Sequence, residues 1–119
     1  MDNLLNTALA SQQQARQQGF DWPSAIEVID KAHEELAELL AAYKKGNTQD
    51  IQDEYGDVLL VILNLSLHLN LDIKSCLNLS LDKFNNRYKA MLELTKKKKL
   101  IFDNLTLKEK ECIWQEIKK

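Results

Sequence analysis

The sequence predicts an all-α protein, and three observations carry this prediction. The 119 residues include only 3 glycines and 1 proline, which leaves little material for the tight turns of a β-sheet. Leu, Ala, Glu, Lys and Gln dominate the chain, and all of them favour helix. Hydrophobic residues make up 45% of the chain and recur at the spacing of amphipathic helices. Length and composition together fit one globular domain, residues 1–119.

Residues that start or stop helices divide this domain into segments. Gly19 ends the first helix, and Ser24 with Glu27 makes a capping box that opens the second. Gly46 suits the left-handed end of the second helix, and Asn47 or the residue after it suits the start of the third. The predicted long helices cover about residues 2–18, 25–45, 48–69 and 73–95.

The third helix carries the longest apolar run of the chain, Val58 to Leu63. A helix that is apolar on all sides is expected to be buried. Short connections make successive helices antiparallel neighbours, so the four long helices predict a four-helix bundle. A second capping box, Thr106 with Glu109, opens a short extra C-terminal helix. Because the third helix needs cover on every side, we also expect a homodimer.

Bulk properties exclude several classes of protein. The net charge of −2 and the pI near 5.7 give no global basic field, so nucleic acid is not an expected partner. Two cysteines are too few for a disulfide scaffold. No signal peptide is evident, and no apolar run reaches the roughly 20 residues that span a bilayer. We therefore expect no membrane association and a cytoplasmic location. The basic run 96–99 is interpreted as a solvated helix end.

Two pairs of acidic residues lie on the second and third helices. Glu35 and Glu38 are three residues apart, as are Glu54 and Asp57, so each pair shares one helix face. On antiparallel neighbours these faces can meet and bring four carboxylates together. Such a group is costly to bury unless a cation neutralises it, and all-oxygen ligands suit Mg²⁺ or Mn²⁺. The alternative is that these acidic residues form a solvated helix face. Two acidic pairs on adjoining helices, next to an apolar run that is expected to be buried, make this alternative the weaker interpretation.

Other polar residues allow two interpretations each. Lys83 and Arg87 lie four apart on one helix face and can clamp a phosphate chain or be ordinary surface charges. Lys31 can contact a phosphate or pair with a glutamate of its own helix. Asn64, on the stripe of Asp57, can orient a ligand, hold a nucleotide sugar or base, or bridge helices.

His68 lies one turn further along the stripe of Asn64. A single histidine among leucines is interpreted as a satisfied core residue rather than a ligand. His33 is expected at the surface.

The motifs of the chain, taken in order, resemble the MazG nucleoside triphosphate pyrophosphohydrolases. The hallmark of that family is EExxE followed by ExxD, which stands here as Glu34-Glu35-x-x-Glu38 and Glu54-x-x-Asp57. The resemblance covers roughly residues 19–118. Its further motifs are GFDWP at residues 19–23, KFxxR at Lys83 to Arg87, and a terminal WxxxK at Trp114 to Lys118.

The resemblance implies an activity and roles for these residues. The family cleaves nucleoside triphosphates between the α and β phosphates with Mg²⁺, and its members form dimers or tetramers. The implied metal ligands are Glu35, Glu38, Glu54 and Asp57. The implied phosphate contacts are Lys31, Lys83 and Arg87, and the implied nucleotide contact is Trp114. Asn64 and Lys118 complete the predicted substrate-binding residues. Glu34 or Glu38 is the candidate base, and Glu34 is favoured because a tight metal ligand is a poor free base.

Two departures and three alternatives accompany this reading. Asn86 stands where the family often has a second Arg, and Tyr55 where it usually has Leu. A metal-dependent nucleotide-binding or regulatory bundle without turnover is the main alternative. A di-iron bundle requires Glu-x-x-His pairs, and neither histidine follows a Glu by three. A purely structural bundle predicts that Glu38→Gln is harmless or stabilising.

Overall fold

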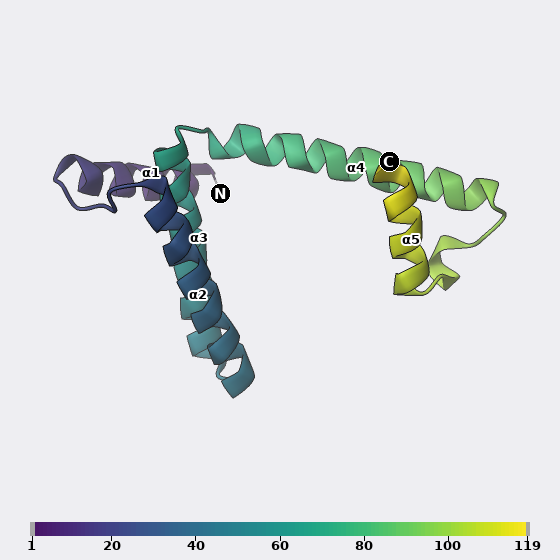
Figure 1. Cartoon of the computed structure of the whole chain (residues 1–119), viewed down its shortest axis with the longest axis horizontal. Helices are drawn as coiled ribbons and strands as arrows, with labels where there is room; N and C mark the ends of the chain where they lie inside the picture. The colour runs from purple at the N-terminus through teal and green to yellow at the C-terminus, as the bar shows by residue number, and fades with distance from the viewer. Residues whose placement is uncertain (1, 119) are drawn as a thin grey trace. The chain divides into compact units, whose positions relative to one another are not determined.

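The computed structural model describes residues 2–118, and every secondary-structure element within them is helical (Figure 1). This confirms the all-α prediction. The chain divides into two compact units, residues 1–73 and 74–119, each of which is described by itself. The helices are α1 (Asp2–Gln17), α2 (Ala25–Lys45), α3 (Thr48–Leu69), α4 (Ile73–Lys97), the 3₁₀ turn η1 (Phe102–Asn104) and α5 (Leu107–Lys118).

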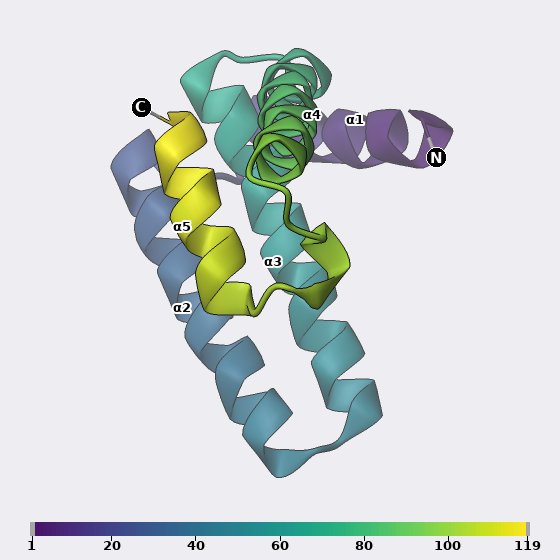
Figure 2. The same ribbon diagram turned by 90° about the vertical axis from the view of Figure 1, so that its right-hand side faces the viewer.

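The first unit is built on an antiparallel hairpin of α2 and α3, which lie side by side in Figures 1 and 2. Gly46 ends α2 in the left-handed conformation, with φ 77°, and its N–H donates to the carbonyls of Ala42 and Tyr43. Asn47 starts α3, and its side chain accepts a hydrogen bond from the Asp50 N–H at 3.1 Å. The predicted turn is therefore confirmed, and it brings the acidic faces of the two helices together.

The two predicted capping boxes have different outcomes. The pair Thr106 and Glu109 is confirmed, because each backbone N–H donates to the side chain of the other residue, at 2.9 and 3.1 Å. The prediction for Ser24 is wrong, since its side chain makes no capping hydrogen bond. There α2 begins through its backbone alone, as Val28 N–H donates to the Ser24 carbonyl at 3.3 Å. The other N–H groups of that first turn can bond to solvent.

The core of the first unit is small. Val28, Ala32 and Val61 form a buried cluster, with Trp22 and Leu65 packed against it. This cluster joins α2, α3 and the connector that follows α1. It lies one to two turns from the acidic pairs, so it holds their helices at a fixed spacing.

The expectation that α3 is buried on all sides is wrong for this unit. Val58 and Leu63 are buried, whereas Leu59, Leu60 and Ile62 are 41–49% exposed. The physical reason is geometric, because α2 and α1 together cover only part of the circumference of α3. The remaining apolar side chains face outward.

The second unit contains α5 and nearly all of α4, and an aromatic cluster joins them. Phe84 of α4 lies 5.7 Å from Trp114 of α5 and 6.2 Å from Tyr88, measured between ring centroids. Phe102 of η1 adds an edge contact to Tyr88 at 6.0 Å. Ring pairs at these separations add packing energy beyond their burial, so they fix the orientation of α5 on α4.

No single helix among residues 2–118 is long and apolar enough to cross a membrane. Helices α3 and α4, counted together, have the length and the apolar composition of a membrane span, and these two properties are the only ones that point to one.

Candidate metal site

Three acidic side chains meet between α2 and α3. Glu35, Glu38 and Glu54 each offer a carboxylate oxygen, and these oxygens lie within 4.8 Å of one another. The turn at residues 46–47 makes α2 and α3 antiparallel, and the i, i+3 spacing aims Glu35 and Glu38 at the same side. The structure therefore brings together three of the four residues predicted as metal ligands.

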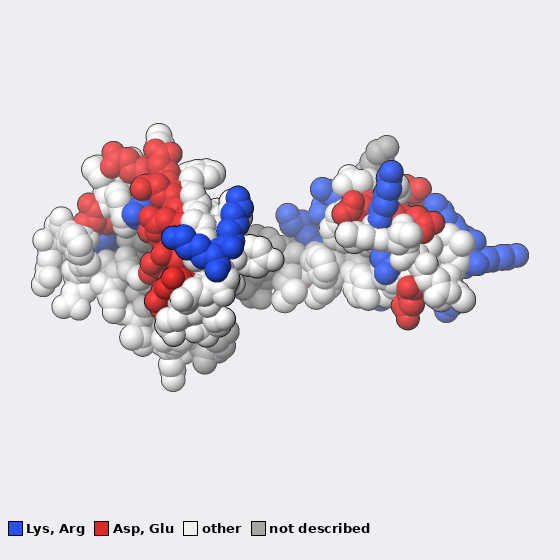
Figure 3. Space-filling view, turned by 90° about the horizontal axis from the view of Figure 1, so that it is seen from below, with Lys and Arg blue, Asp and Glu red and all other residues white. Residues whose placement is uncertain are grey.

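The cluster is closed at one end and open at the other. Glu35 is buried, Glu54 is half-buried and Glu38 is exposed. Figure 3 shows acidic side chains gathered in a band over α2 and α3 of the first unit. An ion can therefore enter from solvent at Glu38 and reach the carboxylate of Glu35.

Two oxygens of the cluster have no partner within residues 2–118. Oε2 of Glu35 and Oε2 of Glu54 are enclosed, and neither accepts a hydrogen bond there. An enclosed carboxylate oxygen without a partner is costly, and three neighbouring carboxylates add mutual repulsion. A hard divalent cation with oxygen ligands removes both costs, so the donor set fits Mg²⁺ or Mn²⁺.

Lys31 is the one cationic side chain found bonded to the cluster among the described residues. Its Nζ lies 3.3 Å from Oε1 of Glu35, one turn away on α2, which is the ion pair within the helix that was one of the two interpretations of Lys31. The pKa of the Lys31 amine lies above its ordinary value of 10.5, because it bonds to Glu35 and lies among the negative charges of neighbouring glutamates. A single ammonium group leaves the other carboxylates of the cluster uncompensated.

Asp57 and Asn64 lie beside the cluster rather than in it. Asp57 is exposed and is not one of the three residues whose oxygens lie within 4.8 Å. Together with Lys31 and Glu35, both line a cavity of about 260 Å³. The cavity also has Gln12 and Trp22 in its wall, so it extends from the acidic cluster toward α1.

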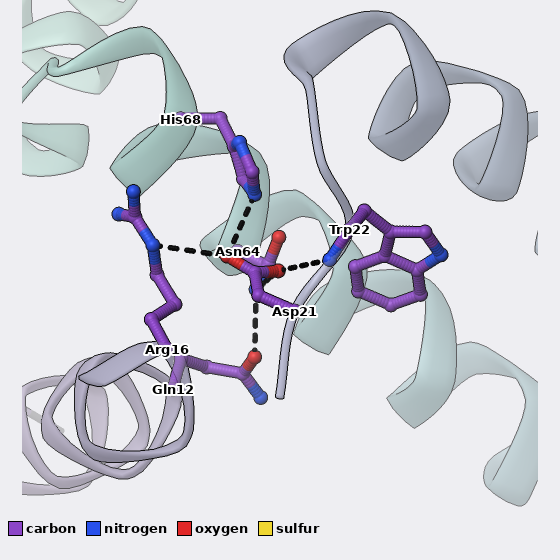
Figure 4. Close-up of polar contacts among 6 residues, drawn as sticks. All are labelled: Gln12, Arg16, Asp21, Trp22, Asn64 and His68. Carbon is purple, nitrogen blue, oxygen red and sulfur yellow. Dashed lines mark hydrogen bonds and ion pairs between the residues drawn. The ribbon is translucent and has the colours of Figure 1, made fainter. Parts of the chain in front are cut away.

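A second polar cluster, centred on Asp21, was not found by pattern analysis (Figure 4). Asp21 Oδ1 accepts from the Trp22 backbone N–H at 2.8 Å and from Asn64 Nδ2 at 3.2 Å. Its Oδ2 lies 2.9 Å from Arg16 Nε and 2.8 Å from His68 Nε2. The GFDWP motif of residues 19–23 contains Asp21 and was the available signal, but no role was predicted for its aspartate.

The contacts of Asp21 stabilise its charged form. Burial alone raises the pKa of this carboxyl, but the hydrogen bonds that it accepts, the one from His68 first, outweigh burial and hold the pKa below 3.8. His68 is only 8% exposed at its side chain and is paired with Asp21. His68 therefore lies in the interior as predicted, and His33 is exposed as expected.

The remaining predicted contacts lie on other surfaces. Glu34 is exposed on α2. In the second unit, the Arg87 guanidinium carbon lies 5.9 Å from the centre of the Trp114 ring, a cation–π arrangement. Lys83 and Lys118 are exposed on α4 and α5 of the same unit. The structure thus brings Arg87 and Trp114 together.

These features agree with the sequence comparisons. Residues 26–92 match the MazG nucleotide pyrophosphohydrolase domain, which is more than half of the chain, and the chain belongs to this family. The matched range contains the acidic cluster, Asn64, Lys83 and Arg87.

Two curated relatives extend the match. The nucleoside triphosphate pyrophosphohydrolase/pyrophosphatase MazG of Thermotoga maritima is 37% identical over 114 residues, which cover 96% of this chain and 44% of the relative. The nucleoside triphosphate pyrophosphohydrolase of Escherichia coli is 27% identical over 103 residues, covering 85% and 39%. The chain therefore spans less than half the length of the curated relatives that it matches.

Proposed function

We propose that this chain hydrolyses nucleoside triphosphates to a nucleoside monophosphate and pyrophosphate with Mg²⁺. The observation that carries the proposal is the meeting of three carboxylates within 4.8 Å, two of which have enclosed oxygens without a partner among residues 2–118. Family membership and the names of the relatives support the same reaction.

The carboxylates of Glu35, Glu38 and Glu54 would hold the ion, with Asp57 beside them as the fourth ligand. Mn²⁺ is expected to substitute, because it takes similar oxygen ligands. When bound, the metal supplies charge neutralisation on the phosphates and lowers the pKa of a bound water.

Cationic residues would hold the triphosphate. The ammonium group of Lys31 is paired with Glu35 of the cluster. A phosphate that binds beside the metal can become a second ion-pair partner of this ammonium group. Arg87 offers a bidentate fork, and Lys83 and Lys118 offer point charges. Trp114 would contact the nucleotide, and its ring is the partner of Arg87.

The hydrolysis step requires a group of the protein that accepts the proton of the attacking water. Water oxygen bonds to the phosphorus on one side of the α–β bridging oxygen, the bond from that phosphorus to the bridging oxygen breaks, and nucleoside monophosphate and pyrophosphate are the products. The proton of the attacking water goes to a carboxylate. Glu34 is the favoured acceptor and Glu38 the alternative, since Glu38 lies in the group that would hold the ion.

The proposed biological role is the removal of unwanted nucleotides from the cellular pool. The proposed working form is a homodimer, since Leu59, Leu60 and Ile62 of α3 are exposed in the first unit. A second copy would supply the cover that these side chains lack.

The test is pyrophosphate release from the common ribonucleoside and deoxyribonucleoside triphosphates, measured with Mg²⁺ and with EDTA. Wild type is compared with Glu38→Gln and with Glu27→Gln. Glu27 is the matched control, because it is an exposed glutamate on the same helix, outside the cluster. Release that requires Mg²⁺, is lost in Glu38→Gln and persists in Glu27→Gln is the expected result.

Absence of release from every nucleotide by a folded wild-type chain would overturn the hydrolase proposal for this panel. Mg²⁺-dependent nucleotide binding without release would instead favour the regulatory bundle considered from the sequence.

A further inference from the structure

A second cavity adjoins the acidic cavity on the side of α1. The first, of about 260 Å³, is lined by Glu35 and Asp57. The second, of about 420 Å³, is lined by the aromatic connector. Gln12, Trp22 and Asn64 are in the walls of both. These three residues therefore border the cavity in which a ligand held at the carboxylates would lie.

Asn64 has one fixed orientation in this wall. Its Nδ2 donates to Oε1 of Gln12 at 2.9 Å and to Oδ1 of Asp21 at 3.2 Å. A carboxylate can only accept hydrogen bonds, so the nitrogen must lie on the side of Asp21. Both hydrogens of the amide are thereby used, and Oδ1 is left to face elsewhere.

That oxygen is an acceptor without a partner. Asn64 is only 3% exposed, and its Oδ1 accepts no hydrogen bond from residues 2–118. A buried acceptor in this state destabilises the fold, which suggests that a ligand satisfies it. Gln12 adds complementary chemistry, since its Oε1 is used by Asn64 while its Nε2 donates no hydrogen bond among the described residues.

The chemistry of this acceptor excludes the phosphate end of a nucleotide. Ionised phosphate oxygens accept hydrogen bonds and cannot donate to Asn64. The sugar hydroxyls and the N–H groups of the bases do donate. Phe20, which is 83% exposed, and the half-buried Trp22 offer aromatic surface beside the second cavity, on which a base can stack.

We propose that Asn64 and Gln12 bind the nucleoside half of the substrate, with Asn64 Oδ1 accepting a hydrogen bond from it and Gln12 Nε2 donating one to it. This inference rests on the proposed function for the identity of the ligand. Oδ1 is enclosed, so the donor reaches it when the side chain of Gln12 or Trp22, neither of them fully buried, moves aside. Asp21 is a positioning residue, which prevents the amide of Asn64 from turning over.

The experiment compares wild type with Gln12→Met, Asn64→Ala and Gln14→Met in the full chain. Gln12→Met keeps the length of the side chain and removes its hydrogen-bonding groups. Gln14→Met makes the same change at an exposed position of α1 that lines neither cavity. Circular dichroism and thermal unfolding establish that each variant is folded. If Asn64→Ala fails to fold, Gln12→Met still decides the question.

Two substrate series separate the possible donors. ATP, dATP and dideoxy-ATP differ in sugar hydroxyls, whereas dATP, dCTP, dGTP and dTTP differ in the base. We expect wild type to discriminate within at least one series by about 5- to 20-fold in KM, the range expected for one or two hydrogen bonds. In Gln12→Met and Asn64→Ala this discrimination falls to about twofold or less, while kcat changes by less than about threefold.

Loss of discrimination in the sugar series assigns the donor to a hydroxyl, and loss in the base series assigns it to the base. Folded variants that keep the KM values and discrimination of wild type would overturn the inference. The same holds if Gln14→Met loses discrimination equally.

Binding of the α,β-methylene analogue of dATP, measured by calorimetry with Mg²⁺, keeps the two proposals apart. An analogue that binds wild type and Gln14→Met but binds Gln12→Met at least about fivefold more weakly supports the inference, even if no pyrophosphate is released. Unaltered analogue binding in Gln12→Met contradicts the inference while leaving hydrolysis intact. An analogue that does not bind wild type contradicts both proposals.

Discussion

Two carboxylates of the first unit are equally shielded from solvent and differ in nearly everything else. The side chain of Asp21 is 10% exposed and that of Glu35 is 9% exposed. Asp21 is contacted by four nitrogen groups, from Arg16, Trp22, Asn64 and His68. Glu35 is contacted by the Lys31 amine, and its Oε2 has no partner within residues 2–118.

This comparison separates two uses of a buried charge. Ion pairs from Arg16 and His68 and hydrogen bonds from Trp22 and Asn64 compensate the charge of Asp21, so Asp21 ties α1, the connector and α3 together. Glu35 keeps one carboxylate oxygen without a hydrogen-bond donor, and two further carboxylates lie beside it. A buried acid that the fold does not satisfy is a candidate functional group, whereas one that it does satisfy is structural. The predictions below test this difference.

The largest expected effect is that of Glu35→Gln on catalysis. We expect pyrophosphate release to fall by at least about 100-fold, because a neutral amide is a poor ligand for a hard divalent cation. In EDTA the free energy of unfolding should stay unchanged or rise, since repulsion within the cluster is relieved. Steady-state assays and urea unfolding check the two halves. A variant that is active, or that is strongly destabilised without metal, would contradict the distinction.

The opposite pattern is expected for Asp21→Asn. This change removes the charge that pairs with Arg16 and His68, and we expect it to lower the free energy of unfolding by about 2 kcal/mol with or without Mg²⁺. Urea unfolding in Mg²⁺ and in EDTA measures this. If the stability of the variant equalled that of wild type, Asp21 would not be the structural carboxylate described here.

Binding of Mg²⁺ should raise the free energy of unfolding, and this increase should require the acidic cluster. At ten times the dissociation constant, Mg²⁺ should stabilise wild type by about 1.4 kcal/mol. Thermal unfolding should show the increase in wild type and Glu27→Gln and lose it in Glu54→Gln. An equal increase in Glu54→Gln would place the ion elsewhere.

The smallest expected effect concerns acid. The pKa of Asp21 in the folded chain lies below its ordinary value of 3.8. Its contribution to stability is therefore present above pH 3.8 and is lost as the pH falls through the lower, folded pKa. The difference in unfolding free energy between wild type and Asp21→Asn should shrink as the pH falls below 3.8. A difference that grows in acid would reverse the sign of the argument.

The helices could be predicted from the sequence because the signals that bound them are local. Gly46 and Asn47 act within one turn, and the structure begins and ends α2 and α3 where the sequence predicts. The acidic cluster was also predictable, since the i, i+3 spacing and one short turn are enough to bring Glu35, Glu38 and Glu54 together.

Burial and long-range polar contacts were harder to predict from the sequence. The exposure of Leu59 and Leu60 depends on how much of α3 its neighbours cover, which the apolar run itself does not encode. The bond between Gln12 and Asn64 joins residues 52 positions apart, and no periodicity links them. The cap at Ser24 failed because a favourable residue type does not guarantee that its hydroxyl is bonded.

The most direct test of the central claim is a titration of the full chain with Mn²⁺, comparing wild type, Glu38→Gln, Glu54→Gln and Glu27→Gln. Calorimetry or the spin resonance signal of free Mn²⁺ reports the affinity. We expect binding to wild type and Glu27→Gln with similar affinity, and at least about tenfold weaker binding in each of the other two variants. Equal affinity in all four proteins, or no binding to wild type, would contradict the assignment of the acidic cluster as a metal site.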